Sequence, residues 1–250
     1  MILQIEKDIL VRMIFLEMSF MNDGYKKANF EWWYFHFISP LKFNIIIHPT
    51  DMYGQKKKSY VSVSMLEKSG EKINFKQSFD LKETSMSSDS LYIKNNILHI
   101  EKINDEILIE LKLKDIQAKL NISKIVIPDL FNEKSVVLCD EIENLSNSWL
   151  LAVSHSVFCG NLQYRNKNIK LSGWAYHDHN WGNWLIHECY SYWVWGNFQN
   201  ANCAITYYYL VGSNGEEIKL LNIIYKKYST NLTNFSIFDF GNRIKIEFNT

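Results

Sequence analysis

The sequence predicts an all-β protein made of antiparallel strands, on three observations. Apolar and polar residues alternate with period two in several runs, as in strands with one buried face. Turn-forming residues fall between these runs at intervals of roughly 8–12 residues, which favours a barrel or sandwich over alternating strands and helices. The chain has only 3 Pro and 10 Gly among 250 residues, so we expect long strands and few loops.

Taken in order, the chain begins with residues 1–25, an extension that we expect to be a short helix. Charged residues interrupt its apolar positions, and no run of about 18 apolar residues occurs anywhere, so we expect no spanning helix and a cytoplasmic protein. The strands follow from about residue 30 to the C-terminus. The alternating runs are 61–65, 107–113, 116–122 and 244–248, and the turn signals are 68–71, 104–105, 165–168 and 213–215.

The charge balance excludes one class of partner. Lys and Arg number 27, Asp and Glu also number 27, and the net charge is zero. Domains that hold nucleic-acid phosphates usually carry a basic excess, so we expect no nucleic acid as partner. The 4 Cys form no C-x-x-C pair and are expected to be free thiols. Aromatic residues make up 15% of the chain, including 8 Trp, and their positions carry more information than their number.

The first aromatic segment, residues 31–37, reads Glu-Trp-Trp-Tyr-Phe-His-Phe. A strand with this many rings is expected to pack on both faces. Glu31 beside such rings would be partly desolvated, which raises a carboxyl pKa and favours a neutral acid. The alternative interpretation is an aromatic core strand with Glu31 at its solvated end.

The second segment, residues 173–182, reads Gly-Trp-Ala-Tyr-His-Asp-His-Asn-Trp-Gly. In a strand, His177 and His179 share one face, and Asp178 and Asn180 point to the other. Three interpretations stay open at this point. His-x-His is a metal-ligand spacing, but no third ligand is evident in the sequence. The others are a structural hydrogen-bond network and an acid–base site in an aromatic pocket, where a carboxylate orients an imidazole.

Motifs for other chemistry do not occur. The sequence has no G-x-S-x-G, no Walker loop and no G-x-G-x-x-G. Five of the 8 Trp lie between residues 174 and 195. Trp and Tyr rings offer rigid apolar surfaces, and their π faces stabilise cations by about 0.5–2 kcal/mol each. We therefore expect a small hydrophobic substrate.

Three elements together resemble the carotenoid 1,2-hydratase family, which also includes lipocalin-like Diels–Alderases, with tocopherol cyclase as a more distant relative. They are Glu-Trp-Trp-Tyr at 31–34, the 173–182 motif, and Trp-x-Trp-Gly at 193–196. The resemblance covers about residues 30–215. It implies lipocalin-like antiparallel β domains that hydrate or cyclise polyunsaturated molecules with no metal and no organic cofactor.

The resemblance also implies roles for particular residues. His179 and Trp181 match positions that act in acid–base catalysis and cation stabilisation. A tyrosine of the next strand is placed at Tyr207, but the aspartate that follows it in the hydratases is missing, so another acid, Glu31 or Asp178, would be needed. The residues expected to line the substrate site are Trp33, Tyr34, Tyr176, His177, Asn180, Trp193 and Trp195.

The expected organisation is two domains after the extension, at 26–175 and 176–250. The second is shorter than in the resembling proteins, so we expect a reduced barrel or a homo-oligomer that completes it. The expected function is cofactor-independent cyclisation of a polyunsaturated natural-product intermediate, by a [4+2] or a proton-triggered route. A hydratase of a carotenoid or terpenoid alkene, and a carrier of an apolar ligand, stay open as alternatives.

Overall fold

The computed structural model of the chain describes residues 12–14, 23–50, 58–126, 136–140, 145–213, 215, 217–225, 228–232, 235–239 and 244–248. The described part is all-β, as the alternation predicts. Its helical elements are one α-helix of four residues, α1 (Ile186–Cys189), and one 3-10 turn, η1 (Leu81–Glu83). No helix among these residues is both long and apolar enough to span a membrane.

A 13-stranded antiparallel sheet forms most of the molecule, in the order β5-β4-β3-β2-β13-β12-β10-β9-β8-β7-β6, with β11 beside β12 and β1 beside β11. Its strands are β1 (Arg12–Ile14), β2 (Phe30–Ile38), β3 (Lys42–Thr50), β4 (Ser59–Leu66), β5 (Lys72–Phe79), β6 (Ser85–Met86), β7 (Tyr92–Lys94), β8 (Leu98–Ile103), β9 (Glu106–Lys112), β10 (Ile116–Val126), β11 (Val136–Asp140), β12 (Leu145–Tyr164) and β13 (Lys167–Gly182).

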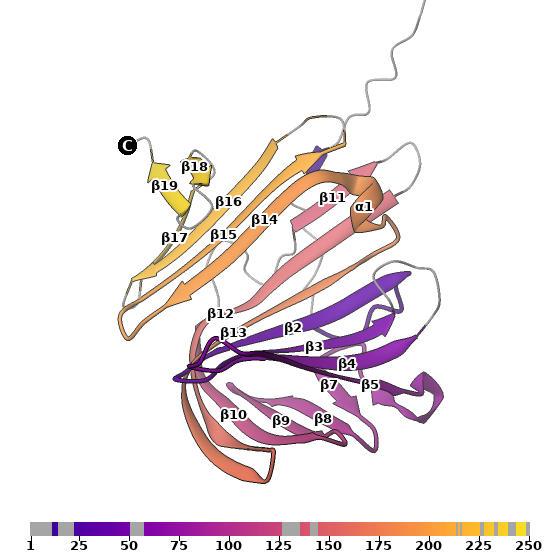
Figure 1. Cartoon of the computed structure of the whole chain (residues 1–250). Helices are drawn as coiled ribbons and strands as arrows, with labels where there is room; N and C mark the ends of the chain where they lie inside the picture. Colours follow the sequence, from indigo (N-terminus) through magenta and orange to yellow (C-terminus); the bar gives the residue numbers. More distant parts are fainter. Residues whose placement is uncertain are drawn as a thin grey trace, which may run out of the picture.

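This first sheet curls into an open half-barrel (Figure 1). The alternating residues of its strands place one apolar face inside the curl. The core there is made of large, fully buried side chains, among them Phe35, Phe37 and Ile45 of β2 and β3. Three turns that the sequence predicts separate neighbouring strands. The turn at 68–71 lies between β4 and β5, that at 104–105 between β8 and β9, and that at 165–168 between β12 and β13.

A second, four-stranded sheet lies against the outer face of the first (Figure 1). It consists of β14 (Tyr190–Gln199), β15 (Cys203–Gly212), β16 (Glu217–Tyr225) and β17 (Tyr228–Leu232), and a hairpin of β18 (Phe235–Asp239) and β19 (Ile244–Phe248) follows. The two sheets are joined by a separate apolar cluster, in which Trp149, Leu151 and Tyr176 of the first sheet meet Tyr208 and Leu210 of the second.

Strand β13 belongs to the first sheet along its whole length. It pairs with β12 on one side and with β2 on the other, up to Gly182. A Cβ at Gly182 would collide with the Ser146 backbone oxygen, so only glycine permits this close approach of β13 to β12. The expected division at 175/176 therefore falls inside β13, and the chain leaves the first sheet after residue 182. The division into two domains stays a prediction.

The expected N-terminal helix is wrong where the structure describes that segment. Residues Arg12–Ile14 form β1, which pairs antiparallel with β11, because a neighbouring strand offers backbone partners that local helix propensity does not outweigh. The remaining residues up to 22 lie outside the described part.

Candidate active site

The alternation of β13 divides the 173–182 motif between the two faces of the first sheet. His177 and His179 lie opposite Phe35 and Trp33 of β2 and point into the curl. Asp178 and Asn180, one residue out of phase, point toward the second sheet. The sequence predicts this separation, but its consequence is that Asp178 contacts neither histidine. The ring nitrogens of His179 have Asp23 and Glu31 as partners, and the carboxylate of Asp178 accepts from Tyr176 and Asn180 instead.

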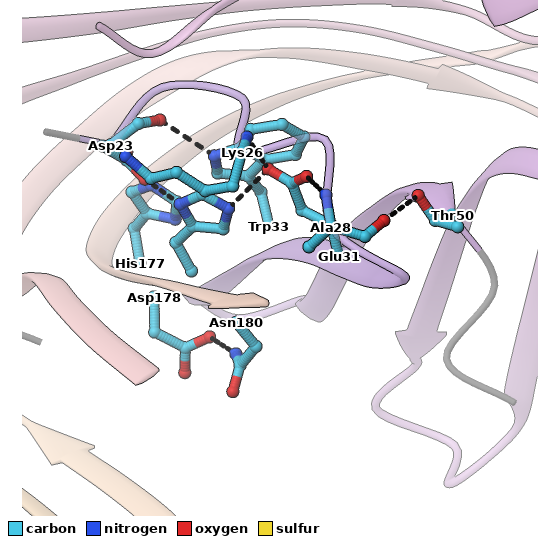
Figure 2. A network of polar contacts seen from close by, with 10 residues as sticks. Asp23, Lys26, Ala28, Glu31, Trp33, Thr50, His177, Asp178 and Asn180 are labelled. Carbon is cyan, nitrogen blue, oxygen red and sulfur yellow. Dashed lines mark hydrogen bonds and ion pairs between the residues drawn. The ribbon is translucent and has the colours of Figure 1, made fainter. Parts of the chain in front are cut away.

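Two other carboxylates partner the histidines inside the curl (Figure 2). Asp23 Oδ2 lies 2.6 Å from His177 Nε2, and Asp23 Oδ1 lies 3.1 Å from His179 Nδ1. Glu31 Oε1 lies 3.0 Å from His179 Nε2. The His177 Nδ1 is 3.0 Å from the Tyr34 backbone oxygen. We call Asp23, Glu31, His177 and His179 the inner cluster.

The inner cluster lies beneath residues 23–28, which we call the strap. The strap is tied down by the backbone N–H of Tyr25, which donates to the Ser87 oxygen at 2.8 Å. The Trp33 indole N–H donates to the Asp23 backbone oxygen at 3.1 Å, and the Lys26 N–H donates to Glu31 at 2.8 Å. Glu31 is fully buried, so it is not at a solvated end of β2. Its expected neutral state stays a prediction.

Charge pairing governs the ionisation of the inner cluster. Burial alone would raise the pKa of Asp23, but the charge and hydrogen bond of His177, with those of His179, hold that pKa well below its usual range. Burial alone would lower the pKa of His179, but its contacts with Asp23 and Glu31 raise it. These contacts favour the protonated form of His179, an imidazolium, beside Asp23 and Glu31.

Aromatic rings enclose this imidazolium. The Trp33 ring stacks on His179 with centroids 4.5 Å apart and an interplanar angle of 18°, and the Trp181 ring lies 4.7 Å away. Phe35 stacks on His177 at 4.0 Å. The Lys26 ammonium lies 5.4 Å from the Trp181 centroid. Indole faces carry negative electrostatic potential, so Trp33 and Trp181 favour the protonated His179.

On the other face of β13, Asp178 is the centre of a second hydrogen-bond network. The Tyr176 hydroxyl donates to Asp178 Oδ2 at 2.7 Å, and the Asn180 amide donates to Asp178 Oδ1 at 2.8 Å. The Trp195 indole of β14 donates to the Tyr176 hydroxyl at 3.0 Å. We call Tyr176, Asp178, Asn180 and Trp195 the interface cluster, because it connects the two sheets.

Burial raises the pKa of Asp178 to about 6, although its hydrogen bonds from Tyr176, Trp149 and Asn180 act in the opposite direction. Burial also raises the pKa of the Tyr176 phenol well above its ordinary value, and the nearby Asp178 charge adds to this. A carboxyl with such a pKa is present as a neutral acid in part of the molecules at neutral pH. A buried group of this kind among aromatic rings is typical of a functional site.

Rings from both sheets surround the interface cluster. Tyr34 meets Trp195 edge to face with centroids 5.1 Å apart, and Trp149 stacks on Tyr208 at 4.6 Å with an angle of 4°. Tyr34 and Trp195 are only half-buried, so this aromatic layer reaches the surface.

Two predicted residues lie away from both clusters. Tyr207 of β15 packs against Gly196, on the face of the second sheet that points away from the first. The tyrosine that faces the interface cluster is its neighbour Tyr208, because adjacent strand residues point to opposite faces. Trp193 is 48% exposed and makes no part of the buried cluster. Both positions differ from what the resemblance implies.

One residue of the inner cluster escapes sequence reasoning. Asp23 lies 154 residues from His177 and follows an extension of mixed charge, with no motif around it. As for metal, no group of three or more His, Cys, Asp or Glu in the described ranges has the arrangement of a metal site. Both histidines instead have carboxylate partners.

Two clefts of the first sheet lie away from both clusters. One of about 500 Å³ is lined by Ile73, Phe75, Ile116 and Tyr164 together with polar residues such as Lys114 and Arg165. A second, of about 430 Å³, has a mainly polar lining from β9, β10 and the hairpin that joins β12 to β13. Neither contains a predicted site residue.

The comparison with solved structures supports the fold. A crystal structure of a Nitrosomonas europaea protein provisionally named AttH is similar with a TM-score of 0.68 and 13% sequence identity, over 89% of this chain and 75% of that one. At this identity the likeness concerns the fold, an AttH-like, lipocalin-like β architecture. No protein-family model matches the chain, and no curated protein matches its sequence.

Proposed function

We propose that this protein is a cofactor-independent enzyme that cyclises a polyunsaturated apolar molecule by proton transfer, with Asp178 as the acid. The observation that carries the proposal is a buried carboxyl, with its pKa raised to about 6, inside an aromatic layer between two sheets. The motif resemblance gives the substrate class, a carotenoid, terpenoid or polyketide polyene. The apolar rings of the layer fit such a substrate.

The proposed chemistry uses the neutral form of Asp178. Its O–H adds a proton to one carbon of an alkene, which leaves a carbocation on the other carbon and a carboxylate on the enzyme. A second alkene of the same molecule attacks the cation and closes the ring. The carboxylate then removes a proton from a neighbouring carbon, so the product is an isomer of the substrate and Asp178 is neutral again.

The surroundings of Asp178 suit these steps. The rings of Tyr34, Trp195 and Tyr208 place π faces near the cation, each worth about 0.5–2 kcal/mol. The hydrogen bond from Tyr176 holds one carboxyl oxygen in place. In this scheme the inner cluster holds β13 in place from the opposite face of the strand. His179 and Glu31 are then positioning residues and do not touch the substrate.

Hydration is the second candidate, and one observation favours it. His179 Nδ1 and Asp23 Oδ1 are both buried without a well-aligned hydrogen-bond partner, although they lie 3.1 Å apart. Such groups would bind a water molecule and hold it for attack on a cation, which in this case would be bound on the curl side of β13. Water addition would then make His179 a catalytic residue, as the resemblance implies.

The experiment incubates the protein with an acyclic carotenoid and an acyclic triterpene in D₂O and in ¹⁸O-labelled water. Proton-triggered cyclisation gives an isomeric product with deuterium and without ¹⁸O, whereas hydration adds one ¹⁸O. We expect Asp178→Asn to abolish conversion, and Asp115→Asn, at an exposed aspartate of the same sheet, to leave it unchanged.

Other outcomes separate the alternatives. Full activity of Asp178→Asn, with no deuterium in the product, would favour a [4+2] closure in which the protein only orients the polyene. Loss of conversion in His179→Ala together with ¹⁸O uptake in the wild type would favour the hydratase. Recovery of an unaltered but bound polyene would make the protein a carrier and overturn the proposed enzyme.

A further inference from the structure

Strand β14 is an open edge of the second sheet. Within the described strands it pairs with β15 alone, and the sheet order begins with it. It is ten residues long, Tyr190–Gln199, and reads Tyr-Ser-Tyr-Trp-Val-Trp-Gly-Asn-Phe-Gln. None of these residues is charged and none is proline. An edge strand of this kind presents unpaired backbone N–H and C=O groups to any extended chain that reaches it.

The two ends of the strand order in the first sheet carry the protection that β14 lacks. The first sheet ends in β5 on one side, where Lys72 and Lys76 place charges on the edge, and in β6 on the other, which has only two residues. Lysines and shortness are the usual devices against edge-to-edge pairing. Their presence at β5 and β6, and their absence at β14, indicate that β14 has a partner strand.

Exposed aromatic side chains on the same strand support this conclusion. Six large apolar side chains are exposed in the described part of the chain, and three of them lie on β14: Tyr192 at 46%, Trp193 at 48% and Phe198 at 57%. A cluster of this kind on one strand is unusual for a surface that stays in water. A strand that pairs with β14 would cover their flanks.

We propose that the partner is a second copy of this chain, with β14 of each copy paired antiparallel about a two-fold axis. With Trp195 opposite the partner copy's equivalent position, Tyr192 of each copy lies across from position 198 of the other. The four-stranded sheets of the two copies then form one sheet of eight strands. Aromatic cross-strand pairs of this type stabilise antiparallel sheets.

The charge pattern favours a second copy over an unlike partner. An uncharged strand repels no copy of itself, and the whole chain has a net charge of zero, so two copies meet without net repulsion. Two-fold antiparallel pairing uses the β14 edge of both copies, so it closes at a dimer and leaves no further open edge on β14. This inference is independent of the proposed activity.

The first test measures mass in solution by light scattering and analytical ultracentrifugation. The wild type is expected at twice the 29.6 kDa of one chain. The double variant Tyr192→Lys with Phe198→Lys places like charges opposite each other at two positions, and we expect it to raise the dimer dissociation constant by about 30-fold or more. The matched control, Leu66→Lys with Tyr225→Lys, changes two equally exposed apolar residues away from β14 and should remain dimeric.

A second test fixes the register and does not depend on the lysine variants folding. Under mild oxidation and with the exposed Cys159 replaced by Ser, Tyr192→Cys with Phe198→Cys should form intermolecular disulfides, whereas each single variant and the parent should not. In the wild type, hydrogen–deuterium exchange of residues 190–199 should accelerate on dilution, while that of the β5 edge should not change with concentration. A monomeric wild type, an assembly larger than a dimer, or a dimer insensitive to both double variants overturns the proposal.

Discussion

The Asp23 carboxylate and the His177 imidazole meet at 2.6 Å between Oδ2 and Nε2, although 154 residues separate them in the chain. Through this contact the strap closes over the inner cluster. The same carboxylate reaches His179, so one side chain connects both histidines of the motif to a segment that precedes the first long strand.

Asp23→Asn is expected to lower the free energy of unfolding by about 3–5 kcal/mol. The substitution leaves two buried imidazoles without their shared negative partner, and removing one member of a buried ion pair has a cost of this size. Denaturant unfolding at pH 7 measures it. The control Asp89→Asn, at an exposed position near the strap, should change the free energy by less than about 0.5 kcal/mol. Equal effects of the two substitutions would contradict the ion-pair assignment.

His179 and Glu31 should show strong energetic coupling. His179→Phe keeps a ring on Trp33 but removes the positive partner of Glu31, and Glu31→Gln removes the negative one. We expect each single substitution to destabilise, and the double variant to be less unstable than the sum by about 1–3 kcal/mol. A double-mutant cycle from denaturant unfolding measures this coupling, and additive effects would show that the contact contributes little.

The pH dependence of His179 has a definite sign. Its pKa is raised in the folded protein, so its contribution to stability is complete below the unfolded value of about 6.5 and is lost as pH rises through the folded value. The wild type should therefore lose stability relative to His179→Phe as the pH rises from about 6.5 through the pKa of His179 in the folded protein. Unfolding curves at a series of pH values measure the difference, and a constant difference would refute a raised pKa.

Asp178 changes the stability of the protein with pH in the opposite direction to an ordinary ion-paired aspartate. Its pKa in the folded protein, about 6, exceeds the ordinary aspartate pKa of 3.8, so the folded state binds more protons between these values and stability falls as pH rises through them. The shift corresponds to roughly 3 kcal/mol above pH 6. Asp178→Asn should remove this pH dependence and be the more stable protein at pH 8, while losing the proposed activity. A pH profile identical to that of the wild type would rule out the raised pKa.

Gly24→Ala tests how closely the strap is held. A Cβ at this position would collide with the Ser88 backbone oxygen and carbonyl carbon, which lie in a loop beside the strap. Backbone cannot yield as a flexible side chain does, so we expect a loss of about 1–3 kcal/mol in stability. Faster hydrogen exchange at Tyr25, whose N–H bonds to Ser87, should accompany it. Unchanged exchange there would mean that the strap accommodates the methyl group.

The fold class and the faces of the strands follow from the amino-acid pattern. Period-two alternation specifies which side chains share a face whatever the partner strand is, so the separation of His177 and His179 from Asp178 follows from the pattern alone. The turns at 68–71, 104–105 and 165–168 are equally local, and all three lie where the residues predict them. In the aromatic strand at 31–37, Trp33, Phe35 and Phe37 share the buried face for the same local reason.

Which residues meet across those faces depends on how distant segments pack together. Asp23 joins the inner cluster because the strap crosses the curl, and Tyr208 rather than Tyr207 faces Asp178 because of the phase in which β15 enters the second sheet. The strand at Arg12–Ile14 likewise depends on β11 lying beside it. Contacts of this kind join segments distant in the chain, and alternation carries no information about which segments become neighbours.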